Sequence, residues 1–356
     1  MNQLNIGVIG CGYWGPNLLR NFVGIPEVEN VAAADLNWKQ LDRIKGLYPH
    51  VEVTDDYRTF FDMGLDAVAI ATPPATHFKI AKDCLENSVH TFVEKPITLC
   101  SQDAKELIEL ARVKRLTLMV GHTFEYNPAV RKMKEIISSG ELGRIYYIKA
   151  DRASLGLFQP DINVIWDLAP HDLSILLFLL DHPPLTVQAI GDYRIFPKLH
   201  DIAYMHLEFE GKVTAHLHLS WLDPCKVRRI TIVGSQKMLV YDDVESQEKI
   251  RIYDKGVENP SFTETFGEFV CNYRYGDIVI PHIKFTEPLR IECRHFINCI
   301  LDKSSKPISC GEQGLTIVQI LEAAQLSLEN DGQLYQLQYD EPSIPVLEMT
   351  EELIGE

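Results

Sequence analysis

The first 121 residues alternate short apolar runs with segments of helical periodicity, and this rhythm restricts the possible folds more than any other feature. Strand–helix–strand repeats connect through right-handed crossovers, which produce a mostly parallel sheet covered by helices. We therefore expect a doubly wound α/β domain over residues 1–121. Its strands are predicted at 4–9, 30–34, 51–53, 67–72, 90–94 and 116–120, and its helices at 14–23, 37–47, 76–88 and 101–114.

The pattern changes after Gly121. Between residues 185 and 253 the chain consists of short apolar runs joined by hairpin-length turns, which predicts a large, open and mostly antiparallel sheet. We therefore expect a second, α+β domain over 122–340, followed by an acidic tail over 341–356. The helices of this domain are predicted at 128–138, 167–180, 287–302 and 312–329.

Composition and charge exclude several classes of protein. At roughly 150 residues per domain, a chain of 356 residues predicts two domains. The formal net charge of −16 argues against nucleic acid or an anionic membrane as partner, because both attract a cationic face. The longest apolar run, Leu173–Leu180, is too short to cross a bilayer, and the first residues lack the pattern of a secretory signal. We expect a cytoplasmic protein.

Neither the cysteines nor the histidines predict a metal site. The eight cysteines include no CxxC pair and are expected to be reduced thiols. Cys293, His295 and Cys299 lie on one predicted helix, but no second ligand pair has zinc spacing. The same lack of matching ligands holds for three histidines of the predicted sheet, His206, His216 and His218.

A glycine-rich turn, Gly10-Cys11-Gly12-Tyr13-Trp14-Gly15, joins the first predicted strand to the first helix. Gly10 suits a tight turn, Gly12 lets the backbone approach a pyrophosphate, and Gly15 allows close helix packing. The helix N-terminus then favours the anion. Asp35 ends the second strand, where a carboxylate accepts hydrogen bonds from ribose hydroxyls and repels a 2′-phosphate. The turn therefore predicts a dinucleotide site, with NAD favoured over NADP.

Polar residues follow two further strands of the predicted parallel sheet. Glu94-Lys95-Pro96 ends the fifth strand, and Thr72-Pro73-Pro74 ends the fourth, with His77 one helical turn later. Ligands of open α/β sheets bind at the carboxyl ends of strands. A lysine at this position needs a polar partner, so we expect Lys95 to contact Glu94 or a substrate hydroxyl.

Asp167 and His171 are four residues apart and share one face of a predicted helix. A carboxylate beside an imidazole can raise its basicity and orient it, as a general base requires. Taken alone, such a pair is more often a helix cap with a surface histidine, so its functional meaning depends on the other motifs.

These motifs occur together in one known family. They follow one another as Gly10-x-Gly12-x-x-Gly15, Thr72-Pro73-Pro74 with His77, Glu94-Lys95-Pro96 and Asp167-x-x-x-His171. Over roughly residues 4–330 the chain resembles the glucose–fructose oxidoreductase, inositol dehydrogenase and rhizopine-catabolism (Gfo/Idh/MocA) family. The resemblance implies a Rossmann domain, an oxidoreductase that uses a nicotinamide cofactor on a sugar, cyclitol or polyol, and a homodimer or homotetramer formed through the open sheet.

The resemblance also implies roles for individual residues. Lys95 would hydrogen-bond the reacting hydroxyl, His171 would take its proton, and Asp167 would orient the substrate or the histidine. The implied cofactor contacts are Gly10, Gly12, Tyr13, Trp14, Gly15, Asp35, Thr72, Pro73, His77, Glu94, Lys95 and Asn127. Many members have an arginine in the loop after the sixth strand, where this chain has Gly121–Pro128. Glu125, Tyr126 and Asn127 are expected to approach the nicotinamide or the sugar, with Tyr126 as a substrate contact, and the roles of Glu125 and His122 stay open.

The segment around Trp166 and Asp167 resembles a subgroup that acts on nucleotide-activated sugars, and Trp166 is implied as a further substrate contact. This implies chemistry at C3 of a UDP-linked N-acetylhexosamine or its uronic acid, for surface-polysaccharide synthesis. Residues 131–152 carry six bases against three acids in a chain that is otherwise acidic. Within this segment, Arg152 is the expected phosphate contact. The open alternatives are a free-sugar or inositol dehydrogenase and a non-catalytic, cofactor-binding regulatory protein.

Overall fold

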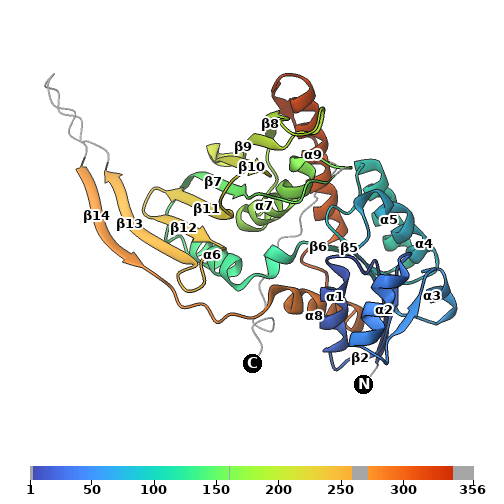
Figure 1. The fold of residues 1–356 in the computed structure, drawn as a ribbon. Helices are drawn as coiled ribbons and strands as arrows, with labels where there is room; N and C mark the ends of the chain where they lie inside the picture. Colours follow the sequence, from blue (N-terminus) through green and yellow to red (C-terminus); the bar gives the residue numbers. More distant parts are fainter. Residues whose placement is uncertain (1–2, 160, 259–271, 340–356) are drawn as a thin grey trace, which may run out of the picture. The chain divides into compact units, whose positions relative to one another are not determined.

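The computed structural model describes residues 3–159, 161–258 and 272–339, and the chain divides into two compact units (Figure 1). The first contains the chain up to Asn127 together with Thr286–Glu322, and the second contains Pro128–Phe285 with Ala323–Gln338. The sequence prediction placed 286–322 in the second domain. This segment instead belongs to the first unit, because its helix α8 (Pro288–Leu301) packs on helix α1 (Gly15–Val23). The acidic tail predicted at 341–356 lies outside the described residues.

Among the described residues, the first unit holds a six-stranded parallel sheet in the order β3-β2-β1-β4-β5-β6. The strands are β1 (Leu4–Ile9), β2 (Val28–Ala34), β3 (Glu52–Thr54), β4 (Ala67–Ile70), β5 (His90–Glu94) and β6 (Leu118–Gly121). The predicted doubly wound domain is confirmed. Because β2 and β4 flank β1, the strand order reverses there, at the place where such sheets bind ligands.

The remaining elements of the first unit are mostly helices. They are α1, α2 (Trp38–Leu47), α3 (Thr59–Asp62), the 3-10 helix η1 (Pro74–Thr76), α4 (His77–Glu86), α5 (Ser101–Lys114), the 3-10 helix η2 (Thr123–Tyr126) and α8. Phe296 of α8 makes edge-to-face contacts with Phe22 of α1 and Phe92 of β5, with ring centroids 6.4 and 5.7 Å apart. Aromatic burial of this kind holds α8 against the sheet although some 165 residues separate it from β6.

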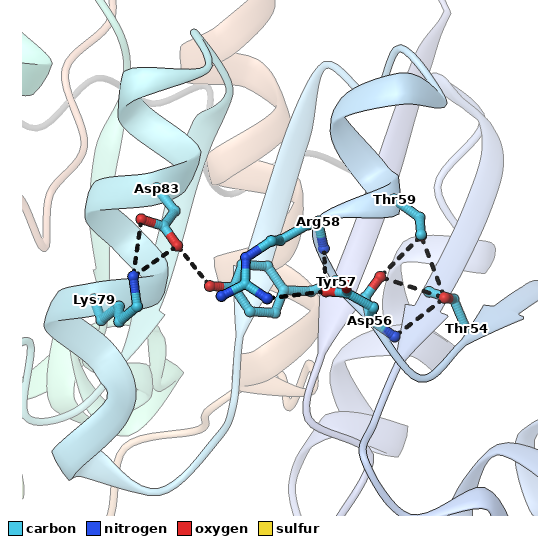
Figure 2. Close-up of polar contacts among 7 residues, drawn as sticks. All are labelled: Thr54, Asp56, Tyr57, Arg58, Thr59, Lys79 and Asp83. Atoms are coloured by element: carbon cyan, nitrogen blue, oxygen red, sulfur yellow. Dashed lines mark hydrogen bonds and ion pairs between the residues drawn. The ribbon is translucent and has the colours of Figure 1, made fainter.

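A polar cluster joins the segment after β3 to helix α4 (Figure 2). The Tyr57 hydroxyl donates to Asp83 at 2.6 Å, and the same carboxylate pairs with Lys79 at 3.3 Å. Within the segment, Thr59 and the backbone of Asp56 bond to the Thr54 hydroxyl at 3.2 Å each. These contacts brace the short strand β3, which has only one neighbouring strand in the described sheet.

Within the described residues, the second unit contains a nine-stranded sheet in the order β14-β13-β12-β11-β7-β10-β9-β8-β15. Only β7 and β10 pair in parallel among the described pairings, so the predicted open and mostly antiparallel sheet is confirmed. The strands are β7 (Ile145–Ala153), β8 (Thr186–Asp192), β9 (Ile202–Glu208), β10 (Thr214–Ser220), β11 (Val227–Gly234), β12 (Met238–Asp242), β13 (Ile250–Glu258), β14 (Asn272–Val279) and β15 (Tyr335–Gln336). A 3-10 turn, η3 (Glu210–Lys212), joins β9 to β10.

Helices α6 (Pro128–Ser138) and α7 (Val164–Leu180) belong to the second unit, and α9 (Gly311–Glu329) is divided between the units after Glu322. Helix α7 begins three residues before its predicted start, because the Asn163 side chain accepts hydrogen bonds from the backbone N–H groups of Ile165 and Trp166. None of the helices in the described ranges is both long and apolar enough to cross a membrane.

Candidate active site

The glycine turn has the geometry that a dinucleotide requires. Gly10 has φ +94°, which L side chains rarely adopt, and a Cβ at Gly15 would lie 1.8 Å from the carbonyl oxygen of Gly10. A Cβ at Gly12, by contrast, would meet no described atom within 4 Å. The turn is therefore closed on its helix side and open at Gly12, so these residues fit a pyrophosphate.

The helix that follows this turn leaves its first N–H groups available. Trp14 occupies the N-cap position of α1, and its side chain makes no capping hydrogen bond. Uncapped N–H groups and the helix dipole attract anions. Tyr13, which was expected at the cofactor, is 87% exposed, as a ring beside an open binding surface would be.

Asp35 connects the glycine turn to the end of β2. Its half-buried carboxylate accepts the backbone N–H of Cys11 at 2.6 Å and that of Asn37 at 2.8 Å. The residue predicted to bind the ribose therefore also fixes the turn that faces the pyrophosphate. Fixing the turn and binding the ribose both require a hydrogen-bond acceptor at the end of β2.

We expect Asp35→Ala to weaken NAD binding by about 10- to 100-fold. The variant removes an acceptor that carries a charge, and such hydrogen bonds contribute about 1.5–3 kcal/mol each. Titration calorimetry with NAD measures the loss, and Asp42→Ala, at an exposed position on α2, is the matched control. Equal affinities for the two variants would contradict a ribose or turn-fixing role for Asp35.

His77 does not face the cofactor as predicted. It is 1% exposed, and its ring nitrogens lie 2.8 Å from the carbonyl oxygens of Pro96 and Thr72. Burial lowers the pKa of His77, so the ring is neutral and donates its single N–H to one of these two carbonyls, which is a structural contact. It joins the loop after β4 to the loop after β5 and thereby positions Thr72, which is half-buried, and Pro73, which is exposed.

Glu94 and Lys95 lie at the carboxyl end of β5. Glu94 pairs in register with Gly121 of β6, and a Cβ at Gly121 would lie 2.8 Å from the Glu94 Cδ. The carboxyl group therefore covers the end of β6. Burial raises the pKa of Glu94 to about 7, and the Lys95 ammonium opposes this shift.

Three buried titratable residues near these strand ends have no role assigned from the sequence. Glu125 and Glu292 are 0% exposed and His122 is 1% exposed. The Thr123 hydroxyl donates to Glu292 at 2.6 Å. Burial and the Glu94 charge hold the pKa of Glu292 well above its usual range, and burial followed by the Lys95 charge lowers the pKa of His122 to about 3. His122 is therefore neutral.

Tyr126, predicted at the substrate, lies inside the first unit. It is 0% exposed, and its hydroxyl lies 3.0 Å from the Ser309 Oγ. A fully buried phenol hydrogen-bonded to the segment after α8 packs the unit together, a structural contact that the prediction did not include. Asn127, predicted at the cofactor, is 5% exposed and ends the same unit.

In the second unit, Asp167 and His171 are both half-buried and lie one helical turn apart on α7. The Trp221 indole N–H donates to the Asp167 carboxylate at 3.0 Å, which fixes its orientation. Trp166, expected at the substrate, is only 9% exposed. Lys95 belongs to the first unit, whereas Asp167 and His171 belong to the second.

Arg152, the predicted phosphate contact, forms a buried ion pair in the second unit. It is 5% exposed, and its Nε and Nη2 atoms each lie 2.8 Å from a carboxylate oxygen of Asp172. A phosphate contact would require this buried bidentate pair to break, which would leave the Asp172 charge without its partner.

Three of the other five bases of residues 131–152 are paired with acidic side chains. Lys132 pairs with Glu135 at 2.8 Å, Lys149 pairs with Asp151 at 2.9 Å, and Lys134 pairs with Asp181. Counting charge along the sequence omitted Asp181, which the fold brings to Lys134. The charges of these three lysines are therefore balanced by acidic partners.

The expectation about metals concerned two clusters. His295 accepts the backbone N–H of Ile308 at 3.1 Å, and His206 lies 3.4 Å from His216 on the sheet. Within the described ranges, no group of three or more histidine, cysteine or carboxylate side chains could hold a metal ion.

An open glycine turn, an uncapped helix N-terminus and a carboxylate at the end of β2 are the marks of a dinucleotide-binding oxidoreductase. Residues 4–122 match the oxidoreductase family with an NAD-binding Rossmann fold, and residues 130–240 match the GFO/IDH/MocA C-terminal domain. The chain belongs to the GFO/IDH/MocA oxidoreductase family. NAD as cofactor and oxidation or reduction at CH–OH groups are thereby confirmed, and the non-catalytic alternative is set aside.

Two curated relatives differ in their substrates. The chain is 28% identical over 269 residues to UDP-N-acetylglucosamine 3-dehydrogenase from Acidithiobacillus ferrooxidans, covering 72% of this chain and 79% of the relative. It is 25% identical over 317 residues to scyllo-inositol 2-dehydrogenase (NAD(+)) from Bacillus subtilis, covering 84% and 86%.

Solved structures show the same fold. The A. ferrooxidans UDP-N-acetylglucosamine 3-dehydrogenase aligns with a TM-score of 0.75 and 24% identity over 94% of this chain and 100% of that chain. An oxidoreductase from Agrobacterium radiobacter in complex with NAD+, L-tartaric acid and magnesium aligns with a TM-score of 0.78 and 20% identity, covering 94% and 98%.

Proposed function

We propose that this protein is an NAD-dependent dehydrogenase or ketoreductase that acts at C3 of a UDP-linked N-acetylhexosamine or its uronic acid, in surface-polysaccharide synthesis. The observation that carries the substrate class is the similarity to UDP-N-acetylglucosamine 3-dehydrogenase over 72% of the chain. Because Arg152 pairs with Asp172, the proposal does not rest on a cationic phosphate contact. A cytoplasmic homodimer or homotetramer is proposed on the family resemblance alone.

Three side chains carry the proposed chemistry. Lys95 hydrogen-bonds the reacting hydroxyl and stabilises the oxygen as it loses its proton, and His171 accepts that proton. Asp167, held by Trp221, orients the histidine or the sugar. When bound, NAD supplies the carbon that accepts the hydride. The glycine turn, the α1 N-terminus and Asp35 hold the dinucleotide.

The second candidate is a dehydrogenase of free inositols or sugars. It is favoured by the similarity to scyllo-inositol 2-dehydrogenase, which extends over a larger share of this chain than the first relative does. Both candidates use the same cofactor site and the same three side chains, so they differ only in what surrounds the sugar.

A thermal-shift panel separates the two candidates. The protein is saturated with NAD or NADH and then mixed with UDP-N-acetylhexosamines, their uronic acids, other nucleotide sugars, free hexoses or inositols. We expect the UDP-linked N-acetylated sugars to raise the melting temperature most, because a ligand stabilises by RT ln(1 + [L]/Kd). Stabilisation by free polyols alone would leave the inositol candidate and refute the nucleotide-sugar proposal.

A further inference from the structure

The carboxyl edge of the first unit brings together two acids from distant parts of the sequence. The Glu94 carboxyl at the end of β5 lies over Gly121, and Thr123, two residues later, donates to Glu292 of α8 at 2.6 Å. Glu292 is 0% exposed. Helix α8 thus adds a second acid to the edge where the parallel strands end.

Each carboxyl group has a buried Oε1 atom that makes no hydrogen bond of standard geometry with the described residues, although the Trp14 indole N–H lies close enough to Glu94 to lower its pKa. Such atoms are rare in folded proteins and indicate groups that exchange protons or meet a ligand. The charged or titratable groups around the pair are Lys95, His122, Glu125, Tyr126 and Cys293, together with the Trp14 indole.

Two neighbouring carboxylates in a dry site do not both ionise at neutral pH. Glu292 is fully buried and accepts only the Thr123 hydroxyl among the described contacts, so it keeps its proton. Glu94 lies beside the Lys95 ammonium, which favours its charged form. Glu94 is therefore the member of the pair that changes its charge near neutral pH, and its charge is sensitive to whatever lies beside it.

The strand order places the nicotinamide half of the cofactor near Glu94. In a doubly wound sheet the pyrophosphate lies over the glycine turn, and the two halves of the dinucleotide extend over the strands on either side of the switch point. The adenosine half lies toward β2, where Asp35 is, and the other half toward β4, β5 and β6. The oxidised nicotinamide ring carries a positive charge that the reduced ring lacks.

We infer that Glu94 releases its proton to solvent when NAD+ binds and retains it when NADH binds, so that pH sets the relative affinity for the two forms. The positive ring favours the carboxylate, whereas the neutral ring only excludes water and favours the acid. This inference rests on the proposed cofactor position beside Glu94.

The direction in which NAD+ affinity changes with pH follows from the number of protons released on binding. Because NAD+ binding releases a proton, NAD+ affinity increases as pH rises through the titration of Glu94 and levels off above it. A full proton released corresponds to a tenfold change in affinity per pH unit below the midpoint. Given a midpoint pKa of about 7 for Glu94, we expect NAD+ to bind about tenfold tighter at pH 8 than at pH 6, whereas NADH binds no tighter.

Isothermal titration calorimetry tests this directly. Titrations of wild-type protein with NAD+ and NADH at pH 7, in two buffers of different ionisation enthalpy, count the protons exchanged. Dissociation constants at pH 6, 7 and 8 measure the linkage between cofactor binding and protonation, which is the change in affinity with pH. Glu94→Gln should bind both forms with no pH-dependent ratio. Glu106→Gln removes an exposed acid that pairs with Lys82 and should match the wild type.

Glu292→Gln identifies which acid exchanges the proton. An amide imitates a protonated carboxyl, so this variant should keep a linkage close to that of the wild type. Loss of the linkage in Glu292→Gln, or its persistence in Glu94→Gln, would overturn the inference. Equal proton counts for NAD+ and NADH in the wild type would do the same, whereas failure to bind either form would refute the proposed cofactor site instead.

Discussion

Replacing Lys95 with methionine is expected to lower turnover by about 10²- to 10⁴-fold while NAD binding changes by less than about tenfold. Proton transfer and charge stabilisation by a positioned side chain contribute an effect of this size. The cofactor contacts of the glycine turn and of Asp35 do not depend on Lys95. Methionine keeps the length of the side chain and removes only its charge and its donors.

Single-turnover absorbance of NADH, with saturating NAD and the sugar found by the thermal-shift panel, measures the loss. Lys79→Met on α4 is the matched control, because that lysine is an exposed partner of Asp83. Turnover of Lys95→Met within tenfold of the wild type would refute the proposed role of Lys95. Loss of NAD binding by the variant would instead indicate that Lys95 mainly builds the cofactor site.

The parallel sheet could be predicted because its signal is local. Each central strand is a buried, β-branched run of four to seven residues followed by a polar or glycine turn, and predicted and observed strands differ by a few residues at most. Strand β14 was not predicted, since its side chains are mostly exposed and lack an apolar alternation. A strand that buries neither face leaves no such pattern in the sequence.

The glycine turn and Asp35 could also be predicted, because their spacing follows from one strand, one turn and one helix. For His77, Tyr126 and Arg152 the structure shows structural contacts that the sequence predictions did not include, and the reason is shared. Each side chain has a partner that the local sequence does not reveal: the Pro96 carbonyl, Ser309 and Asp172. A polar residue near a predicted site can equally well hold the site's framework together.

Glu292 is a residue near the candidate site that the sequence did not reveal. Its helix was predicted over 287–302, but no feature of that segment indicates that it packs on α1 rather than within the second unit. The contacts that fix this choice are long-range: the ring contacts of Phe296, the Arg294–Glu27 ion pair and the hydrogen bond from Thr123 to Glu292. Long-range packing therefore decides which acids meet at the carboxyl edge.

Replacing Arg152 with methionine is expected to destabilise the protein by about 3–5 kcal/mol. The Arg152 and Asp172 side chains are 6% and 3% exposed, and breaking a buried pair leaves an uncompensated charge in a dry interior. For a chain of 356 residues, such a loss lowers the melting temperature by about 4–7 °C. Thermal denaturation followed by circular dichroism measures it.

Two variants separate this role from the phosphate contact expected from the sequence. Arg152→Met combined with Asp172→Leu removes both charges and should recover most of the lost stability, because a buried pair is often replaceable by apolar side chains. Arg112→Met breaks an exposed pair with Glu109, where the side chains are 72% and 58% exposed, and should cost at most about 1 kcal/mol. If Arg152 instead bound a diphosphate, Arg152→Met would weaken UDP-sugar binding at nearly unchanged stability, and the double variant would recover nothing.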